Sequence, residues 1–398
     1  MKYFYILTLL VVFLSCNKDE KIKLITNPNE YNKYLIDNNN QTFERARSEK
    51  EFWSKRLRPD SSGVGDLGPL AKAYTAMYEA SGGISYLKSA EKIYRKALNI
   101  SANHKDLFVR GLANNLMAQR RFKEATIILE KSFKGKSNKR ATQFLLFDVN
   151  MELGNYLEAD KLLGLLKNTN DYNYLLRLSK WMDYKGNTAA AIRNLKKAMK
   201  IADSRKSKIL QIWTYTQLAE LYFNSERVEE AYLLYLKVLK LQPDHSIAKK
   251  QIAWILFSFE KNTTESIRII NSIMHINRFP DLLLFKAKIA DYQENTSESN
   301  QLKNAFIETV TNKEYGNMYN KELIDLYSES DPERALQVAK EELTVCSTPD
   351  SYALFAYAQF KNGQKEKALQ LIEEKVKGKT HNSNTLYYQD LIFNANEK

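Results

Sequence analysis

The stretch that decides the fold is residues 219–243, AELYFNSERVEEAYLLYLKVLKLQP. Ala231 stands twelve residues after Ala219, and Tyr235 and Pro243 follow it by four and twelve residues. Small residues at this spacing let two helices approach closely, and large residues such as Tyr235 fill the space between them. Proline ends the second helix because it lacks the backbone donor that would continue it. The stretch therefore predicts two antiparallel helices joined by a short turn.

The same spacing recurs along the chain. The small residue of the second helix is repeated at Ala90, Ala125, Ala159, Ala191, Ala231, Ser266, Ser299, Ala335 and Ala368. Successive centres lie 35, 34, 32, 40, 35, 33, 36 and 33 residues apart. The sequence thus predicts about nine repeats, of which those at Ser266, Ser299 and Ala335 are the weaker copies. One helical pair cannot bury its own apolar face, so neighbouring pairs must stack to build a core.

This pattern resembles the tetratricopeptide repeat, whose period is about 34 residues. The resemblance implies an all-α fold, a right-handed α-α superhelix of about nine helical hairpins with a concave groove. We expect the array to cover residues 66–378. The 40-residue step between Ala191 and Ala231 contains a polar insert, residues 203–208, which should lengthen a helix end or a loop.

The N-terminus has the pattern of an export signal. Lys2 is followed by an apolar run that is too short to span a bilayer, and the run ends at FLSC, Phe13 to Cys16. These four residues resemble the lipobox of bacterial lipoproteins, although Phe13 stands where that family usually has leucine. The resemblance implies a signal peptide over residues 1–15, lipidation at Cys16, and attachment to the outer membrane on its periplasmic or surface face. An ordinary signal peptide without a lipid is the alternative.

The flanks of the array have their own expected roles. Residues 16–65 should provide a tether and an N-terminal capping helix, in which the Asn-rich segment at 27–40 is a tether or an irregular cap and the helix covers 44–57. Residues 379–398 should form a C-terminal capping helix. These flanks leave no room for a catalytic domain, so we expect no enzyme activity and no cofactor.

No metal site is expected either, because the four histidines lie far apart and none has a metal-binding spacing. The 60 Lys and Arg residues outnumber the 47 Asp and Glu residues, for a net charge of +13, but the two signs are interspersed. Interspersed charge is typical of solvated helix faces rather than of a nucleic-acid site. An acidic partner or an anionic lipid surface stays open. Of the two cysteines, Cys346 has the character of a small buried apolar residue.

The resemblance also implies where a partner binds. In tetratricopeptide repeats the exposed groove residues lie eleven and fifteen positions before the small residue of the second helix. On this chain they are Arg110, Asn114, Phe144, Asp148, Leu176, Lys180, Thr216, Glu220, and, after one inserted residue, Lys250 and Trp254. Mixed charge with aromatic side chains suits a peptide or a helix lying in the groove. Phe144 and Trp254 could instead pack between repeats.

A carboxylate clamp is a further possibility within the same family. Arg110, Asn114 and Arg177 occupy three of the five places where chaperone-binding members hold a C-terminal carboxylate. At the other two places the chain has Leu145 and Asn173, which differ from the residues of the clamp. This difference disfavours a clamp here.

The leading functional hypothesis is a non-catalytic scaffold or adaptor lipoprotein that binds a protein or peptide in the groove. The alternative is a surface lipoprotein that captures glycans for an uptake system. Members of that second class carry long insertions rich in Trp, Gly and Asn, whereas this chain has only 4 Trp, so the scaffold hypothesis is favoured.

Overall fold

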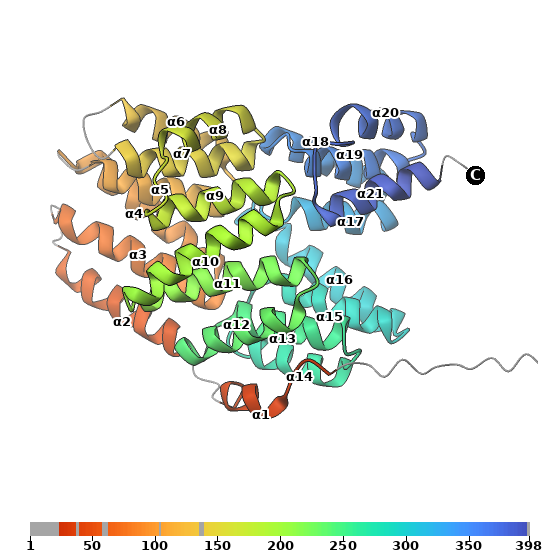
Figure 1. Ribbon diagram of the computed structural model, residues 1–398, viewed down its shortest axis with the longest axis horizontal. Helices are drawn as coiled ribbons and strands as arrows, with labels where there is room; N and C mark the ends of the chain where they lie inside the picture. The colour runs from red at the N-terminus through yellow and green to blue at the C-terminus, as the bar shows by residue number, and fades with distance from the viewer. Residues whose placement is uncertain (1–23, 37–39, 58–62, 103–104, 135–138, 396–398) are drawn as a thin grey trace, which may run out of the picture.

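A computed structural model of the chain describes residues 24–36, 40–57, 63–102, 105–134 and 139–395. The expected signal peptide and Cys16 lie outside these residues. All regular elements in the described part are helices, and no strand occurs there (Figure 1). None of the described helices combines the length and the apolar character that crossing a membrane requires.

Helical pairs follow one another through the described chain. The first helices of the nine pairs are α3 (Val64–Ser81), α5 (Lys105–Ala118), α7 (Lys139–Leu153), α9 (Tyr172–Tyr184), α11 (Lys208–Asn224), α13 (Ser246–Ser258), α15 (Asp281–Tyr292), α17 (Asn320–Ser330) and α19 (Pro349–Lys361). The second helices are α4 (Ile84–Ile100), α6 (Phe122–Phe133), α8 (Tyr156–Leu165), α10 (Thr188–Ser204), α12 (Val228–Leu241), α14 (Thr263–Met274), α16 (Thr296–Val310), α18 (Pro332–Val345) and α20 (Lys365–Lys375). The chain is therefore an all-α superhelix of nine hairpins.

The nine repeat centres explain why the pairs stack. Each centre, from Ala90 to Ala368, lies on a second helix and has 0% of its surface exposed. A larger side chain there would push the neighbouring helices apart. The polar insert at 203–208 lengthens the helices beside it. Helices α10 and α11 have 17 residues each, and three residues connect them.

Two helices flank the nine pairs. Helix α2 (Gln41–Arg56) packs against α3, and α21 (Ser383–Asn394) packs against α19. Residues 24–36, most of which belong to the segment expected to be a tether or an irregular cap, pack on the array. They include the short helices α1 (Pro28–Tyr31) and η1 (Asn32–Tyr34) and lie across α12 and α14. We call residues 24–36 the strap.

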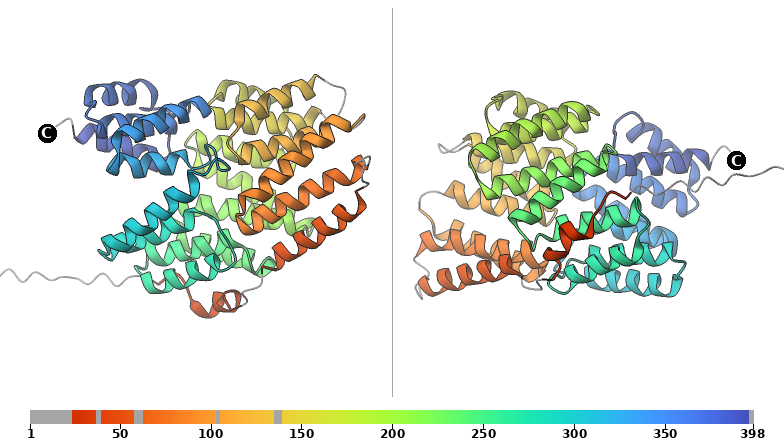
Figure 2. Two further views of the ribbon diagram at one scale, coloured as in Figure 1. Left: turned by 180° about the vertical axis from the view of Figure 1, so that it is seen from behind. Right: turned by 60° about the horizontal axis from the view of Figure 1, so that its bottom comes forward.

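The superhelix curls back on itself, so that late repeats contact early ones (Figure 2). The backbone N–H of Arg278 donates to Ser81 O at 2.7 Å, and Arg120 forms an ion pair with Glu342. We call these contacts the seam. Its residues are Ser81, Gly82, Arg120 and Gly154 on one side, and Arg278, Phe279, Glu342 and Ser347 on the other. The seam brings early and late repeats together around the expected groove, and we call this groove the channel.

Two turn residues adopt a left-handed backbone at the seam. At Gly82, with φ 71°, an added Cβ would lie 2.7 Å from the backbone nitrogen of Phe279, so only glycine fits there. Arg120 has φ 57° without being glycine, which costs about 1–2 kcal/mol. The side chain of Arg120 reaches across to α18, where it meets Glu342.

Candidate partner-binding channel

A cavity of about 1280 Å³ lies beside α3 and α5, and α4 and α11 contribute further lining residues. Arg110 and Asn114, both expected in the groove, line this cavity. Trp213 of α11 lines it as well, and 57% of its surface is exposed. The cavity therefore combines two predicted residues with an aromatic side chain that the sequence reasoning did not select.

The cavity has an apolar floor that glycine residues make possible. Tyr94 and Phe108 line it, and both pack directly against glycine backbone. A Cβ at Gly111 would lie 2.4 Å from the Tyr94 ring, and one at Gly68 would lie 3.2 Å from the Phe108 ring. An apolar surface with a few polar groups at its edge is typical of a ligand-binding site.

Charged pairs join the first helices in the middle of the array. Arg177 on α9 holds Asp148 on α7 at 2.5 and 3.2 Å, and Lys180 pairs with Glu152 at 2.7 Å. Phe144 is only 7% exposed, and its ring contacts the guanidinium group of Arg177. The distance from the ring centroid to Arg177 Cζ is 4.7 Å. Phe144 thus packs between repeats, as the alternative interpretation had it, and offers no open face to a partner.

The carboxylate clamp loses further support from these contacts. The Arg110 guanidinium already binds Asp106 of its own helix at 2.8 Å, and the Arg177 guanidinium binds Asp148. A clamp needs guanidinium groups whose donors are available to a carboxylate. Both arginines instead stabilise the array.

The other predicted groove residues lie on α9, α11 and α13. Leu176 is partly buried within the apolar core, and Thr216 donates its hydroxyl to Ile212 O of its own helix at 2.8 Å. Lys250 pairs with Asp281 of the next first helix at 2.6 Å. The rings of Trp254 and Phe285 pack edge to face, with centroids 5.1 Å apart. Trp254 therefore also packs between repeats.

Several carboxylates of the channel have raised pKa values. Glu79 lines the cavity and Glu220 lies on α11, and desolvation by the surrounding protein raises the pKa of both carboxyl groups. The charge of Asp183 raises the pKa of Glu220 further, whereas Lys250 opposes this effect.

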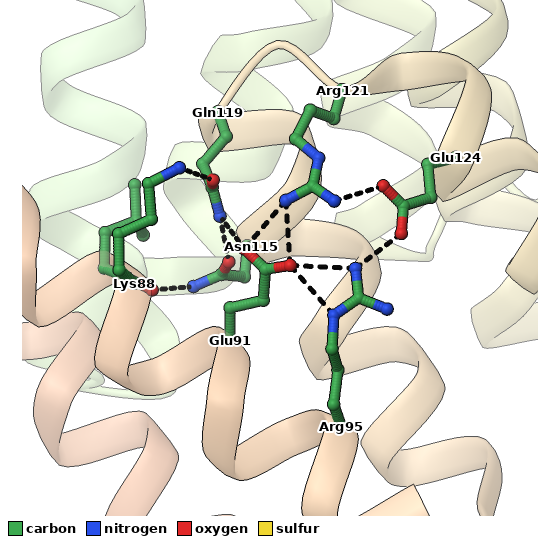
Figure 3. A network of polar contacts seen from close by, with 8 residues as sticks. Lys88, Glu91, Arg95, Asn115, Gln119, Arg121 and Glu124 are labelled. Carbon is green, nitrogen blue, oxygen red and sulfur yellow. Dashed lines mark hydrogen bonds and ion pairs between the residues drawn. The ribbon is translucent and has the colours of Figure 1, made fainter. Parts of the chain in front are cut away.

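A buried polar network holds the first two repeats together (Figure 3). Glu91 on α4 lies at its centre and accepts hydrogen bonds from Arg121, Arg95 and Gln119 at 2.8 to 2.9 Å. Burial alone would raise the pKa of Glu91, but these hydrogen bonds outweigh burial and lower it. Lys88 extends the network by donating to Gln119 at 2.6 Å. Because these donors and acceptors satisfy one another, the network is structural.

A smaller cavity of about 520 Å³ lies between the α7–α10 region and the C-terminal repeats. Its lining residues are Tyr156, Tyr184, Lys185, Ser347, Pro349, Tyr352, Lys375, Gly378, Lys379 and His381. The rings of Tyr156 and Tyr184 stack with centroids 4.0 Å apart. This cavity combines aromatic rings with lysine side chains and carries no carboxylate among its lining residues.

Two residues with reactive side chains have structural surroundings. His245 caps α13, because its Nδ1 accepts the backbone N–H of Ala248 at 3.2 Å, and burial lowers its pKa to about 4. Cys346 is buried at the seam, where burial and Glu342 raise the pKa of its thiol. A raised pKa leaves little reactive thiolate at neutral pH.

Fold and channel together define a helical-repeat protein whose first helices line a channel. The particular repeat is indicated by residues 214–245, which match the family described as Tetratricopeptide repeat. This match indicates a tetratricopeptide repeat at these residues. The matched residues are the α11–α12 pair that contains Ala231.

A solved structure shares the fold over most of the chain. A human IFIT1 dimer with PPP-AAAA is 13% identical, with 82% of this chain and 76% of that chain covered and a TM-score of 0.50. A tetratricopeptide repeat protein from Parabacteroides merdae is 16% identical, with 63% and 94% covered and a TM-score of 0.40. PilF from Pseudomonas aeruginosa is 13% identical, with 56% and 96% covered and a TM-score of 0.38. No curated protein matches the chain.

Proposed function

We propose that the chain is a non-catalytic scaffold that binds a segment of a partner protein in its channel and is anchored to the bacterial outer membrane through Cys16. Tetratricopeptide repeat proteins are generally protein-interaction scaffolds. The observation that carries the proposal is the cavity beside α3 and α5, which offers an apolar floor, polar side chains at its edge and the exposed ring of Trp213. Exposed aromatic residues at such positions serve as anchors in protein interfaces.

Site-specific photo-crosslinking in native membranes tests the channel. A crosslinking amino acid at Asn114, which lines the cavity, should yield a defined protein adduct. The matched control is Leu157 on α8, which is 84% exposed on a second helix and should not yield that adduct. Trp213→Ala should weaken the adduct at position 114 because the partner loses an anchor. The same adduct at both positions would refute binding in the channel.

The membrane anchor has its own test. Cys16→Ala should release the folded protein from membranes, because acyl chains hold a protein on a bilayer by burying methylene groups. Mass spectrometry of the N-terminal peptide of the wild-type protein should show the added lipid. Continued membrane association of the folded variant would contradict the anchor.

A second candidate function is the capture of an acidic glycan. The smaller cavity favours it, because tyrosine rings present flat faces to a sugar and lysines attract its anionic groups. Calorimetry with acidic oligosaccharides should then show binding that Lys375→Gln weakens. Equal binding by the wild-type protein and this variant would count against the second candidate.

A further inference from the structure

A buried carboxylate that comes much later in the sequence binds the N-terminal end of the strap. Glu260, in the turn between α13 and α14, is 7% exposed and lies 234 residues after Thr26. Its carboxylate accepts the backbone N–H groups of Ile25 and Thr26 at 2.7 and 2.6 Å. The Thr26 hydroxyl donates to the same carboxylate at 3.2 Å. Hydrogen bonds to an ionised acceptor are the strong ones, so this point of the strap is held firmly.

The middle of the strap is fixed by tyrosine side chains. The Tyr232 hydroxyl on α12 accepts the backbone N–H of Asn27 at 3.1 Å and donates to Glu30 at 2.8 Å. Tyr31 is almost completely buried in the core of repeats five and six, and its hydroxyl donates to Glu265 on α14 at 2.8 Å. The strap therefore packs as part of the array and cannot swing away as a free tether would.

The chain beyond the strap is held as well. The Thr42 hydroxyl and backbone N–H donate to Asp244, which precedes α13, at 2.8 and 2.6 Å. Asn40 donates its side-chain amide to Ala80 O at the end of α3, at 2.7 Å. With both ends attached, the strap crosses repeats five and six along one fixed path, visible in the right-hand view of Figure 2.

We propose that the strap fixes which side of the array faces the membrane, and that this side is the turn between α13 and α14. The inference rests on the lipid anchor at Cys16 proposed above. Leu24, the first residue of the strap, lies eight residues after Cys16. Eight residues span at most roughly 29 Å when fully extended. This reach is about the length of one 17-residue helix, about 26 Å. Because Ile25 and Thr26 are bound at Glu260, the lipid on Cys16 must enter the membrane within that distance of the α13–α14 turn.

With this placement, the α13–α14 turn faces a lipid bilayer. Lys261, next to Glu260, is exposed and would lie near the lipid headgroups. Lys131 on α6 is also exposed, and α6 and α14 lie at opposite sides of the molecule in Figure 1. The two lysines therefore give a near and a far reporter with the same native side chain.

Energy transfer to labelled lipids tests the placement. Acylated protein carrying a dye at Lys261→Cys or Lys131→Cys is reconstituted into phosphatidylethanolamine and phosphatidylglycerol vesicles that contain a headgroup acceptor dye. Cys346 is buried and Cys16 is blocked by lipid, so each variant takes one dye. Transfer should be more efficient from position 261 than from position 131. If Cys16 is acylated and transfer is equal from both positions, the inferred placement is wrong while the lipid anchor stands.

A second pair of variants tests whether the strap causes the placement. Glu260→Ala removes the three hydrogen bonds to residues 25 and 26, so the chain before Asn27 gains reach and the difference in transfer between positions 261 and 131 should shrink. Glu294→Ala is the matched control, because Glu294 is an exposed carboxylate in the turn of the next repeat. Hydrogen exchange at residues 25 and 26 should rise in Glu260→Ala only. A difference that stays undiminished after this rise would overturn the role of the strap, and an unmodified Cys16 would overturn the anchor as well.

Discussion

Replacing Arg120 by methionine is expected to lower the free energy of unfolding by about 3–5 kcal/mol. Arg120 lies in the turn between α5 and α6, and its ion-pair partner Glu342 lies on α18, 222 residues later. Glu342 has 0% of its surface exposed, so the substitution leaves a buried carboxylate without its cation. Methionine keeps most of the aliphatic length of arginine, and the expected loss is therefore one of charge compensation rather than of volume.

Urea unfolding followed by circular dichroism and by tryptophan fluorescence measures this loss. The double variant Arg120→Met, Glu342→Leu should regain most of the stability, because an apolar pair of similar volume replaces a buried ion pair at little or no cost. Two probes are needed because a repeat array can unfold in stages. The reasoning would be refuted by a single variant within about 1 kcal/mol of the wild type, which is the range of an exposed pair. A double variant as unstable as the single one would refute it equally.

Three further predictions concern the repeats themselves. Gly111→Ala should destabilise the array by about 1–3 kcal/mol in urea unfolding, because the new methyl group meets Tyr94, although alanine is the better helix former. Ala231→Leu should lower the urea midpoint strongly, whereas Leu157→Ala should leave it nearly unchanged, and equal effects would contradict the stacking model. His245 has a folded-state pKa of about 4 against 6.5 when exposed, so the unfolded chain binds more protons between these values. Stability should fall by at most about 3 kcal/mol as the pH drops from 6.5 to 4, and His245→Asn, which keeps a capping side chain, should abolish that loss.

The repeats could be predicted from the sequence because their signal is local. Each centre and the large residues around it lie within one period of about 34 residues, and a small residue at the helix crossing is needed in every pair. Even the weaker centres, Ser266 and Ser299, are fully buried in second helices. The extra residues at 203–208 were predictable for the same reason, since they lengthen the step between two otherwise regular centres.

The long-range contacts could not be predicted because they have no period. The carboxylate of Glu260 and the strap residue Thr26 are 234 positions apart, and neither position has a pattern that points to the other. Trp213 was missed for a simpler reason. It stands eighteen residues before Ala231, outside the two groove positions that the family resemblance supplies. A tryptophan near the start of a first helix is the signal that could have found it, and its surface is 57% exposed in the structure.

The seam has a consequence for how this protein folds and changes. In an open solenoid each repeat contacts only its neighbours, so repeats can be added or lost at little cost and folding can spread from any point. Here the turn after α5 must meet α18, and such distant pairing delays folding until most of the chain is assembled. Inserting or deleting one repeat between them would displace Glu342 from Arg120. The number of repeats is therefore constrained by closure, as the number of blades is in a propeller.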